Sequence, residues 1–143
     1  MLLQDKNAVI YGGGGSVGSA VAKGFAREGA TVFLAGSSPL RDYYLGGTQV
    51  AFDAIETIRR QLSVELGPHG IRVVTLESGG VPESMPEGFE GRAEIVEMLE
   101  KSTLLGRAAT LEEIGNVAAF VASDRARSMT AATVNVSGGA LMD

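Results

Sequence analysis

Residues 8–18 read AVIYGGGGSVG, a short apolar run followed by four consecutive glycines and the start of an amphipathic segment. The apolar run, within residues 7–12, is typical of a buried strand. Residues 17–29 carry apolar side chains at helical spacing and end on Gly29, which predicts a helix. Residues 31–36, TVFLAG, predict a second buried strand. A glycine-rich turn between a strand and a helix is the context in which such a turn binds a dinucleotide.

The glycines of this turn fit the spacing G-x-G-x-x-G at Gly13, Gly15 and Gly18. In that pattern they allow a tight exit from the strand, close approach of the backbone to a pyrophosphate, and close packing of helix on strand. The helix that follows points free N–H groups and the positive end of its dipole toward a bound anion. The alternative is a purely structural turn. We predict a pyrophosphate site made by Gly12, Gly13, Gly15, Ser16, Val17 and Gly18.

The end of the second strand bears on which dinucleotide is bound. An acidic residue there usually binds the ribose hydroxyls of NAD. This chain instead has Ser37 and Ser38, with Arg41 three residues further on. NADP is therefore less disfavoured than usual, and either NADP or NAD is a possible cofactor.

Composition excludes several classes of function. The chain has 143 residues, enough for the single domain we predict over residues 1–143, and 45% of them are hydrophobic. A net charge of −5 disfavours nucleic acid and anionic membranes as partners. With no cysteine and one histidine, His69, a metal site is not expected. No long apolar run and no secretory leader are apparent, so we expect a cytoplasmic protein.

The rest of the chain continues the alternation of strands and helices. We predict a helix over 49–66, a strand over 71–78, a loop over 79–91, a helix near 92–100, a helix over 111–124 and a strand over 132–139. Thr110 and Glu113 fit a capping box at the start of the helix over 111–124. This order predicts an α/β fold, a parallel sheet with helices on both faces.

The helix over 49–66 has a predicted inner and outer side. Apolar residues recur at helical spacing and should face the sheet: Ala51, Ile55, Ile58, Leu62 and Leu66. We expect Arg59, Arg60 and Glu65 to face solvent.

Three blocks, 8–36, 56–84 and 104–143, resemble the short-chain dehydrogenase/reductase family, in the family's order. The resemblance implies a Rossmann-like sheet and a nicotinamide dinucleotide, with Gly80 and Val81 near the nicotinamide. Three of the family's strand–helix units are missing between residues 38 and 49. What remains is a reduced sheet of about four strands in the order 2-1-6-7, in family terms. The strand over 71–78 should then lie beside the strand over 7–12.

The resemblance also implies that the family's catalytic groups are absent. The tyrosine of its Tyr-x-x-x-Lys pair falls on Thr48 and the lysine on Phe52, and the serine lies in the missing part. We therefore assign no catalytic residue. Most adenine and ribose contacts are missing too, so any NADP or NAD affinity should be weak or lost. Tyr43 and Tyr44 are the one alternative source of an acid.

Three functions remain open. The chain is an inactive relative with weak nucleotide affinity, an oxidoreductase completed by a partner chain or by the loop after residue 38, or a structural or regulatory partner of a full-length enzyme of this family. Because one long helix covers four strands poorly, we also expect a homo-oligomer through helix 49–66. Residues 79–89 are either the start of a substrate lid or a solvated flexible stretch.

Overall fold

The computed structural model describes residues 1–11, 15–35 and 48–142, with the backbone alone at 35 and 48–55. The main elements are β1 (Asn7–Tyr11), α1 (Ser16–Arg27), β2 (Thr31–Ala35), α2 (Thr48–Leu66), β3 (Val74–Glu77), α3 (Arg92–Lys101), α4 (Leu111–Ala122) and β4 (Ala132–Asn135). Each predicted helix and strand is present, with ends shifted by up to four residues. The α/β class predicted from the sequence is therefore confirmed.

The strands form two parallel pairs and not one sheet. β1 pairs with β2 in the register Asn7↔Thr31 to Tyr11↔Ala35, and β3 pairs with β4 from Val74↔Ala132 to Glu77↔Asn135. Within the described residues no ladder joins β1 to β3. The neighbours 2-1 and 6-7 of the predicted order are thus confirmed, whereas the prediction that the strand over 71–78 lies beside the strand over 7–12 is wrong.

Both strand pairs are held to α4. α1 and α4 touch through their glycines, since a Cβ on Gly24 would lie 2.8 Å from the carbonyl oxygen of Gly115. α1 in turn packs on β1 and β2. β3 is held separately, because Arg72, just before it, donates hydrogen bonds of 2.7–3.2 Å to carbonyls around the end of α4. Strands must approach to about 4.8 Å to share a ladder. These contacts hold each pair to α4, and in the described structure β1 and β3 share no ladder.

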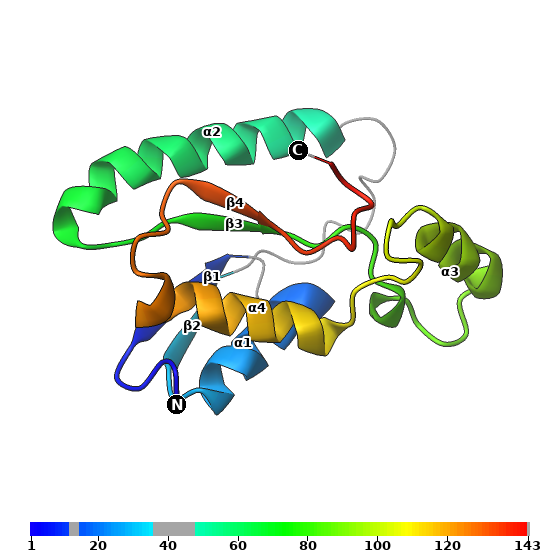
Figure 1. Cartoon of the computed structure of the whole chain (residues 1–143), viewed down its shortest axis with the longest axis horizontal. Helices are drawn as coiled ribbons and strands as arrows, with labels where there is room; N and C mark the ends of the chain where they lie inside the picture. The colour runs from blue at the N-terminus through cyan, green and yellow to red at the C-terminus, as the bar shows by residue number, and fades with distance from the viewer. Residues whose placement is uncertain (12–14, 36–47, 143) are drawn as a thin grey trace.

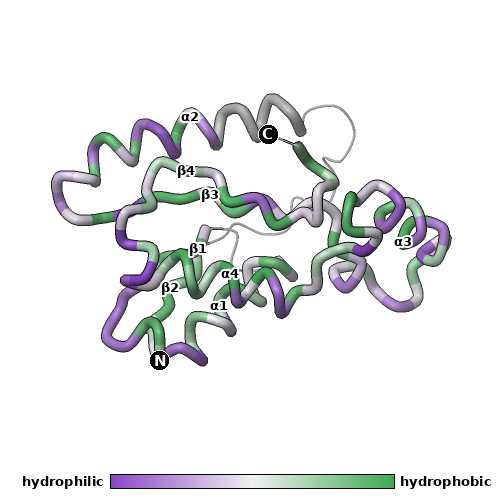
Figure 2. Tube along the Cα trace, in the orientation of Figure 1, coloured by the Kyte–Doolittle hydropathy of each residue, from purple (hydrophilic) through white to green (hydrophobic). Residues whose placement is uncertain are grey.

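The helices lie on both sides of the strands, as predicted. α1 and α4 pack together on one side, and α2 lies over β3 and β4 on the other (Figure 1). Hydrophobic residues follow the strands and α4, whereas α2 alternates between hydrophobic and hydrophilic (Figure 2). The core lies between α1, α4 and the strands and is made of Leu3, Val21, Phe25, Val81, Ala109, Ile114, Ala118 and Ala119.

α2 departs from its predicted orientation at two positions, Arg59 and Ile58. Leu62 and Leu66 are half-buried, in line with the prediction, whereas the side chains of Ala51 and Ile55 lie outside the described residues. Arg59 is only 7% exposed and Ser63 is also buried, whereas Ile58 is 57% exposed. Arg60 and Glu65 are exposed, as expected. Placing Arg59 toward solvent and Ile58 toward the sheet was therefore wrong. The reason is that a carboxylate on α2, described below, bonds to polar side chains on the sheet and turns this side of the helix inward.

Candidate functional site

The described part of the glycine turn leads directly into α1. Gly15 is the N-cap residue, with extended backbone angles (φ −82°, ψ 169°), and α1 begins at Ser16. Gly15 has no side chain with which to cap the first amide groups of the helix, and Ser16 is exposed. Val17 and Gly18 are half-buried in the first turn. Such a helix end can bind an anion through its N–H groups.

Several predicted residues cannot be placed. Gly12 and Gly13, together with Ser37, Ser38 and the tyrosines Tyr43 and Tyr44, lie outside the described residues. Thr48 and Phe52 lie in the first turns of α2, where the structure describes the backbone alone.

The segment after β3 is anchored at its start. Val81 is buried in the core at 6% exposure, and its carbonyl accepts hydrogen bonds from the amide and hydroxyl of Ser84. A Cβ on Gly80 would lie 2.4 Å from a methyl group of Leu99, so α3 packs directly on this glycine. The Glu83 carboxylate accepts a 2.8 Å hydrogen bond from the amide of Leu111. Glu83 thus stabilises the start of α4, a role that its sequence context did not reveal, while the glutamates further along this loop, Glu87 and Glu90, are exposed.

These features share one end of the molecule. The N-terminal ends of α1 and α4 and the C-terminal ends of β3 and β4 all point the same way (Figure 1). In open α/β folds, ligands bind at the carboxyl ends of the strands. The described part of the predicted turn, residues 15–18, and the Gly80–Val81 segment are thus at the end of the fold where ligands bind in such folds.

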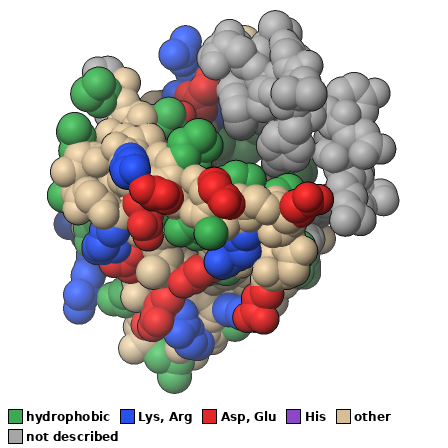
Figure 3. Space-filling view, turned by 90° about the vertical axis from the view of Figure 1, so that its right-hand side faces the viewer, with side chains coloured by type: hydrophobic (Ala, Val, Ile, Leu, Met, Phe, Trp, Pro, Cys, Tyr) green, Lys and Arg blue, Asp and Glu red, His purple; other side chains and the backbone are tan. Residues whose placement is uncertain are grey.

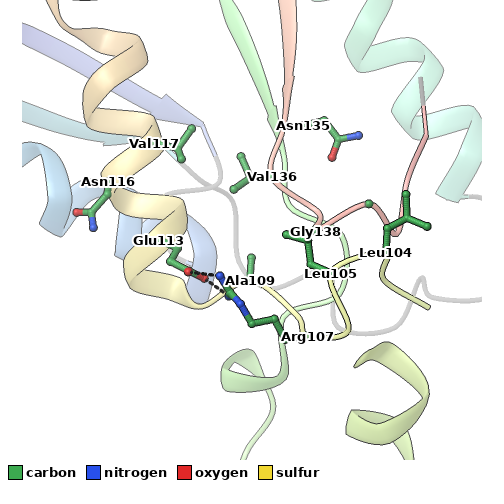
Figure 4. Close-up of a pocket in the computed structure, with 11 residues that line it drawn as sticks. Leu104, Leu105, Arg107, Ala109, Glu113, Asn116, Val117, Asn135, Val136 and Gly138 are labelled. Carbon is green, nitrogen blue, oxygen red and sulfur yellow. Dashed lines mark hydrogen bonds and ion pairs between the residues drawn. The ribbon is translucent and has the colours of Figure 1, made fainter. Parts of the chain in front are cut away.

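A cavity of about 670 Å³ lies at the same end, between α4, the end of β4 and the segment over 104–109 (Figure 4). Its lining is mostly apolar, with Val117 and Val136 on opposite walls. The Arg107 guanidinium binds both carboxylate oxygens of Glu113, each at 2.8 Å. This pair and the Thr110 amide, 3.0 Å from the carboxylate, lower the pKa of Glu113 to about 2.

The chemistry of this cavity follows from that pair. Glu113 and Thr110 form the predicted capping box, which is confirmed, but the partnership with Arg107 was not foreseen. A carboxylate with a pKa of about 2 is ionised near neutral pH and cannot serve as a general acid there. The cavity offers apolar surface but no poised proton donor among its described ionisable groups.

A second polar cluster joins α2 to β3 and β4. The Glu56 carboxylate accepts hydrogen bonds from Arg59 at 2.6 and 3.0 Å and from the hydroxyls of Thr75 at 2.5 Å and Thr133 at 3.2 Å. The bonds from Arg59 and then Thr75 lower the pKa of Glu56 to about 2. Sequence reasoning missed this cluster; the available signal was an acid–base pair three residues apart on a helix, with a threonine in each of two apolar strands.

The chain is similar in sequence to known proteins. Residues 47–140 match the family model described as "Enoyl-(Acyl carrier protein) reductase". The chain is also 32% identical, over 96% of its length, to a short-chain dehydrogenase/reductase of Armillaria gallica. The chain belongs to the short-chain dehydrogenase/reductase family. It is similar as well to "Enoyl-[acyl-carrier-protein] reductase [NADH] FabI" of Bacillus cereus, with 32% identity over 80% of this chain.

Length and fold complete the comparison. The chain spans about half of these curated relatives, 48% of the Bacillus cereus protein and 50% of the Armillaria protein. The crystal structure of an enoyl-[acyl-carrier-protein] reductase (NADH) from Aquifex aeolicus has a TM-score of 0.75 at 16% identity, over 98% of both chains. That likeness shows a shared Rossmann-like fold. The family resemblance expected from the three sequence blocks is confirmed.

The described residues were also expected to contain no metal site, and their surface charges are mixed. No group of three or more metal-ligating side chains occurs among the described residues, and no described helix is long and apolar enough to cross a bilayer. On the face viewed in Figure 3, acidic and basic side chains are interspersed with hydrophobic ones.

Proposed function

We propose that this member of the short-chain dehydrogenase/reductase family is a nicotinamide-dinucleotide-binding type of domain that lacks hydride-transfer activity on its own and binds NADP or NAD weakly or not at all. One observation carries the proposal. The first turns of α2, where the resemblance implies a tyrosine and a lysine, contain Thr48 and Phe52. A threonine hydroxyl is far too weak an acid to replace a phenol, and a phenylalanine supplies no charge.

The described residues fit one end of a dinucleotide better than the other. At the pyrophosphate end, the start of α1 offers amides that Gly15 leaves uncapped. At the nicotinamide end, the side chain of Val81 is buried in the core, so that this residue can offer only its backbone. When bound, a nicotinamide cofactor supplies the hydride, while Gly15 and Ser16 would bind its pyrophosphate. The Bacillus cereus relative carries NADH in its name, which supports a nicotinamide dinucleotide as the ligand class.

Calorimetric titration with NADPH and with NADH tests the binding part. We expect dissociation constants above about 100 μM, because each tenfold loss of affinity corresponds to about 1.4 kcal/mol, the size of one or two lost hydrogen bonds. Ser16→Glu is a useful variant, since a carboxylate in the first turn stabilises a helix but repels a phosphate. It should abolish residual binding without lowering the melting temperature. A micromolar constant for either dinucleotide would contradict the proposal.

A panel of carbonyl, alcohol and enoyl-thioester substrates tests the catalytic part. We expect no turnover, because general acid–base assistance typically contributes about 10²–10⁴-fold and its donors are missing. The second candidate function is an oxidoreductase completed by the segment over 38–49 or by a partner chain. Clear activity that disappears in Tyr43→Phe or Tyr44→Phe would favour that candidate and sink the first.

Two expectations about cellular context remain predictions. One is a cytoplasmic location away from membranes and nucleic acid. The other is an oligomer through helix 49–66, with itself or with a full-length family member. On the described half of α2, Ile58 and Val64 are exposed apolar residues at 57% and 73%. They support this expectation.

A further inference from the structure

The β1–β2 pair has one covered and one open face. Ala8, Ile10 and Val32 are half-buried and pack toward the core under α1. On the opposite face Val9 is 60% exposed, Tyr11 84% and Phe33 56%, and Val9 lies directly opposite Phe33 in the ladder. We call this the open face, made of Val9, Tyr11 and Phe33. Parallel sheets are normally buried on both faces, so an open face of aromatic and β-branched residues is unusual.

We propose that the open face is a self-association surface, on which two copies of this chain pack their β1–β2 pairs face to face about a two-fold axis. Sheets packed in this way lie about 10 Å apart with interdigitated side chains. In such a two-fold contact the open face of one copy packs against the open face of the other. Phe33 and Tyr11 of one copy can then pack against the same residues of the second copy as offset aromatic pairs.

Charge supports a second copy as the occupant. Residues 7–11 and 31–35 contain no ionisable group other than the Tyr11 phenol, so no like charges meet inside the contact. The net charge of −5 per chain is carried elsewhere, and its repulsion is screened over about 8 Å at physiological salt. Association should therefore strengthen as salt is raised, the opposite of what an interface built on ion pairs would do.

Area sets the expected strength. At these exposures the three side chains leave on the order of 350 Å² of surface open per copy, within the range of patches that are often functional. Two copies with their polar margins, Asn7 and Thr31, reach roughly 1,000 Å² in total, which is the low end for specific interfaces. We expect a reversible dimer with a dissociation constant of about 10–100 μM.

Sedimentation velocity from about 2 to 500 μM, at low and high salt, tests the proposal. The weight-average mass should rise from 14.8 kDa toward twice that value. Val9→Lys and Phe33→Lys should each weaken the dimer at least 30-fold, because each buries an unpaired charge at the contact. The matched control variant is Met98→Lys on α3, 60% exposed and outside both the open face and α2, which should leave the dimer unchanged. Ile58→Lys and Val64→Lys report on the separate contact expected at α2.

Three results would overturn the proposal. The first is a monomer at every concentration, which would leave the open face free for a different partner. The second is a dimer that Ile58→Lys or Val64→Lys abolishes and Val9→Lys does not, which would place the contact on α2. The third result comes from a variant that should not disturb folding. Tyr11→Ser is used if a lysine variant loses its native circular dichroism, because a side chain that is 84% exposed contributes little to the stability of the monomer. An unchanged dissociation constant in folded Tyr11→Ser would refute the contact.

Discussion

Replacing Glu56 by glutamine should destabilise the fold through Arg59. The Arg59 side chain is 7% exposed, and its Nη1 atom has no hydrogen-bond partner in the described structure. Glu56 is the carboxylate that balances its charge, at 2.6 Å. Removing one partner of a buried ion pair typically costs about 3–5 kcal/mol. Because the Glu56 side chain is 28% exposed, solvent compensates in part, and we expect a loss of about 2 kcal/mol.

The pH dependence of the same contact provides a second measurement. The pKa of Glu56 is lowered to about 2 by Arg59 and Thr75, below its usual value near 4.5. A carboxyl group with a lowered pKa in the folded state stabilises the protein above its unfolded pKa. That contribution is lost as the pH falls through the folded pKa. The difference between wild type and Glu56→Gln should therefore be complete above about pH 5 and should shrink toward pH 2.

Urea unfolding followed by circular dichroism at pH 7, 5 and 3 measures both effects. In a separate thermal melt at pH 7, a loss of about 2 kcal/mol in the free energy of unfolding should lower the melting temperature by about 6–8 °C for a chain of this size. Glu65→Gln is the matched control, because Glu65 lies on the exposed side of the same helix and bonds only Gln61 among its described partners. Equal stability of the two variants at pH 7, or a difference between them that does not shrink between pH 7 and pH 3, would refute the role given to Glu56.

Two further substitutions test the contacts that hold the two strand pairs to α4. Gly24→Ala should lower the free energy of unfolding by about 1–2 kcal/mol, because the added Cβ would lie 2.8 Å from the Gly115 carbonyl oxygen. This cost should outweigh the higher helix propensity of alanine. A raised melting temperature would mean that α1 and α4 do not touch at this position. Arg72→Met should lower the free energy of unfolding by about 2–3 kcal/mol, and Arg72→Lys should lose most of the same amount. The reason is that an ammonium group cannot reproduce the two-pronged hydrogen bonding of the guanidinium to the carbonyls of Val121 and Ala122. A lysine variant as stable as wild type would contradict this geometry.

Local sequence patterns predicted the elements well because each pattern reports its own segment. The capping box at Thr110 and the apolar runs of β1 and β2 depend on residues close in sequence, and both were confirmed. The prediction that Arg59 faces solvent was wrong because hydrophobic periodicity assigns a charged residue to the outer side of a helix. Arg59 faces inward only because Glu56 meets Thr75 and Thr133, which are 19 and 77 residues away. No local pattern contains that information.

The candidate site was predictable to a similar extent. The sequence placed Gly15 and Ser16 at the start of a helix, as observed, and the assignments of Gly12, Gly13, Ser37 and Ser38 remain predictions. The buried side chain of Val81 and the bond from Leu111 to Glu83 were not foreseen. Both depend on α4 packing near the end of β3, a contact between segments about 30 residues apart.

The division of the strands into two pairs and the proposed loss of activity have separate causes. The start of α1 is positioned by the packing of Gly24 on Gly115, and therefore does not need a ladder between β1 and β3. A pyrophosphate turn can thus persist in a divided sheet. The acid–base pair that the family resemblance implies would come from the first turns of α2, where Thr48 and Phe52 provide neither group. α2 is bound to β3 and β4 through Glu56, and both strand pairs are held to α4, so the divided sheet does not by itself oppose hydride transfer. The proposed loss of activity therefore rests on residue identity, since effective acid catalysis requires a proton-donating group held within hydrogen-bond reach of the reacting atom.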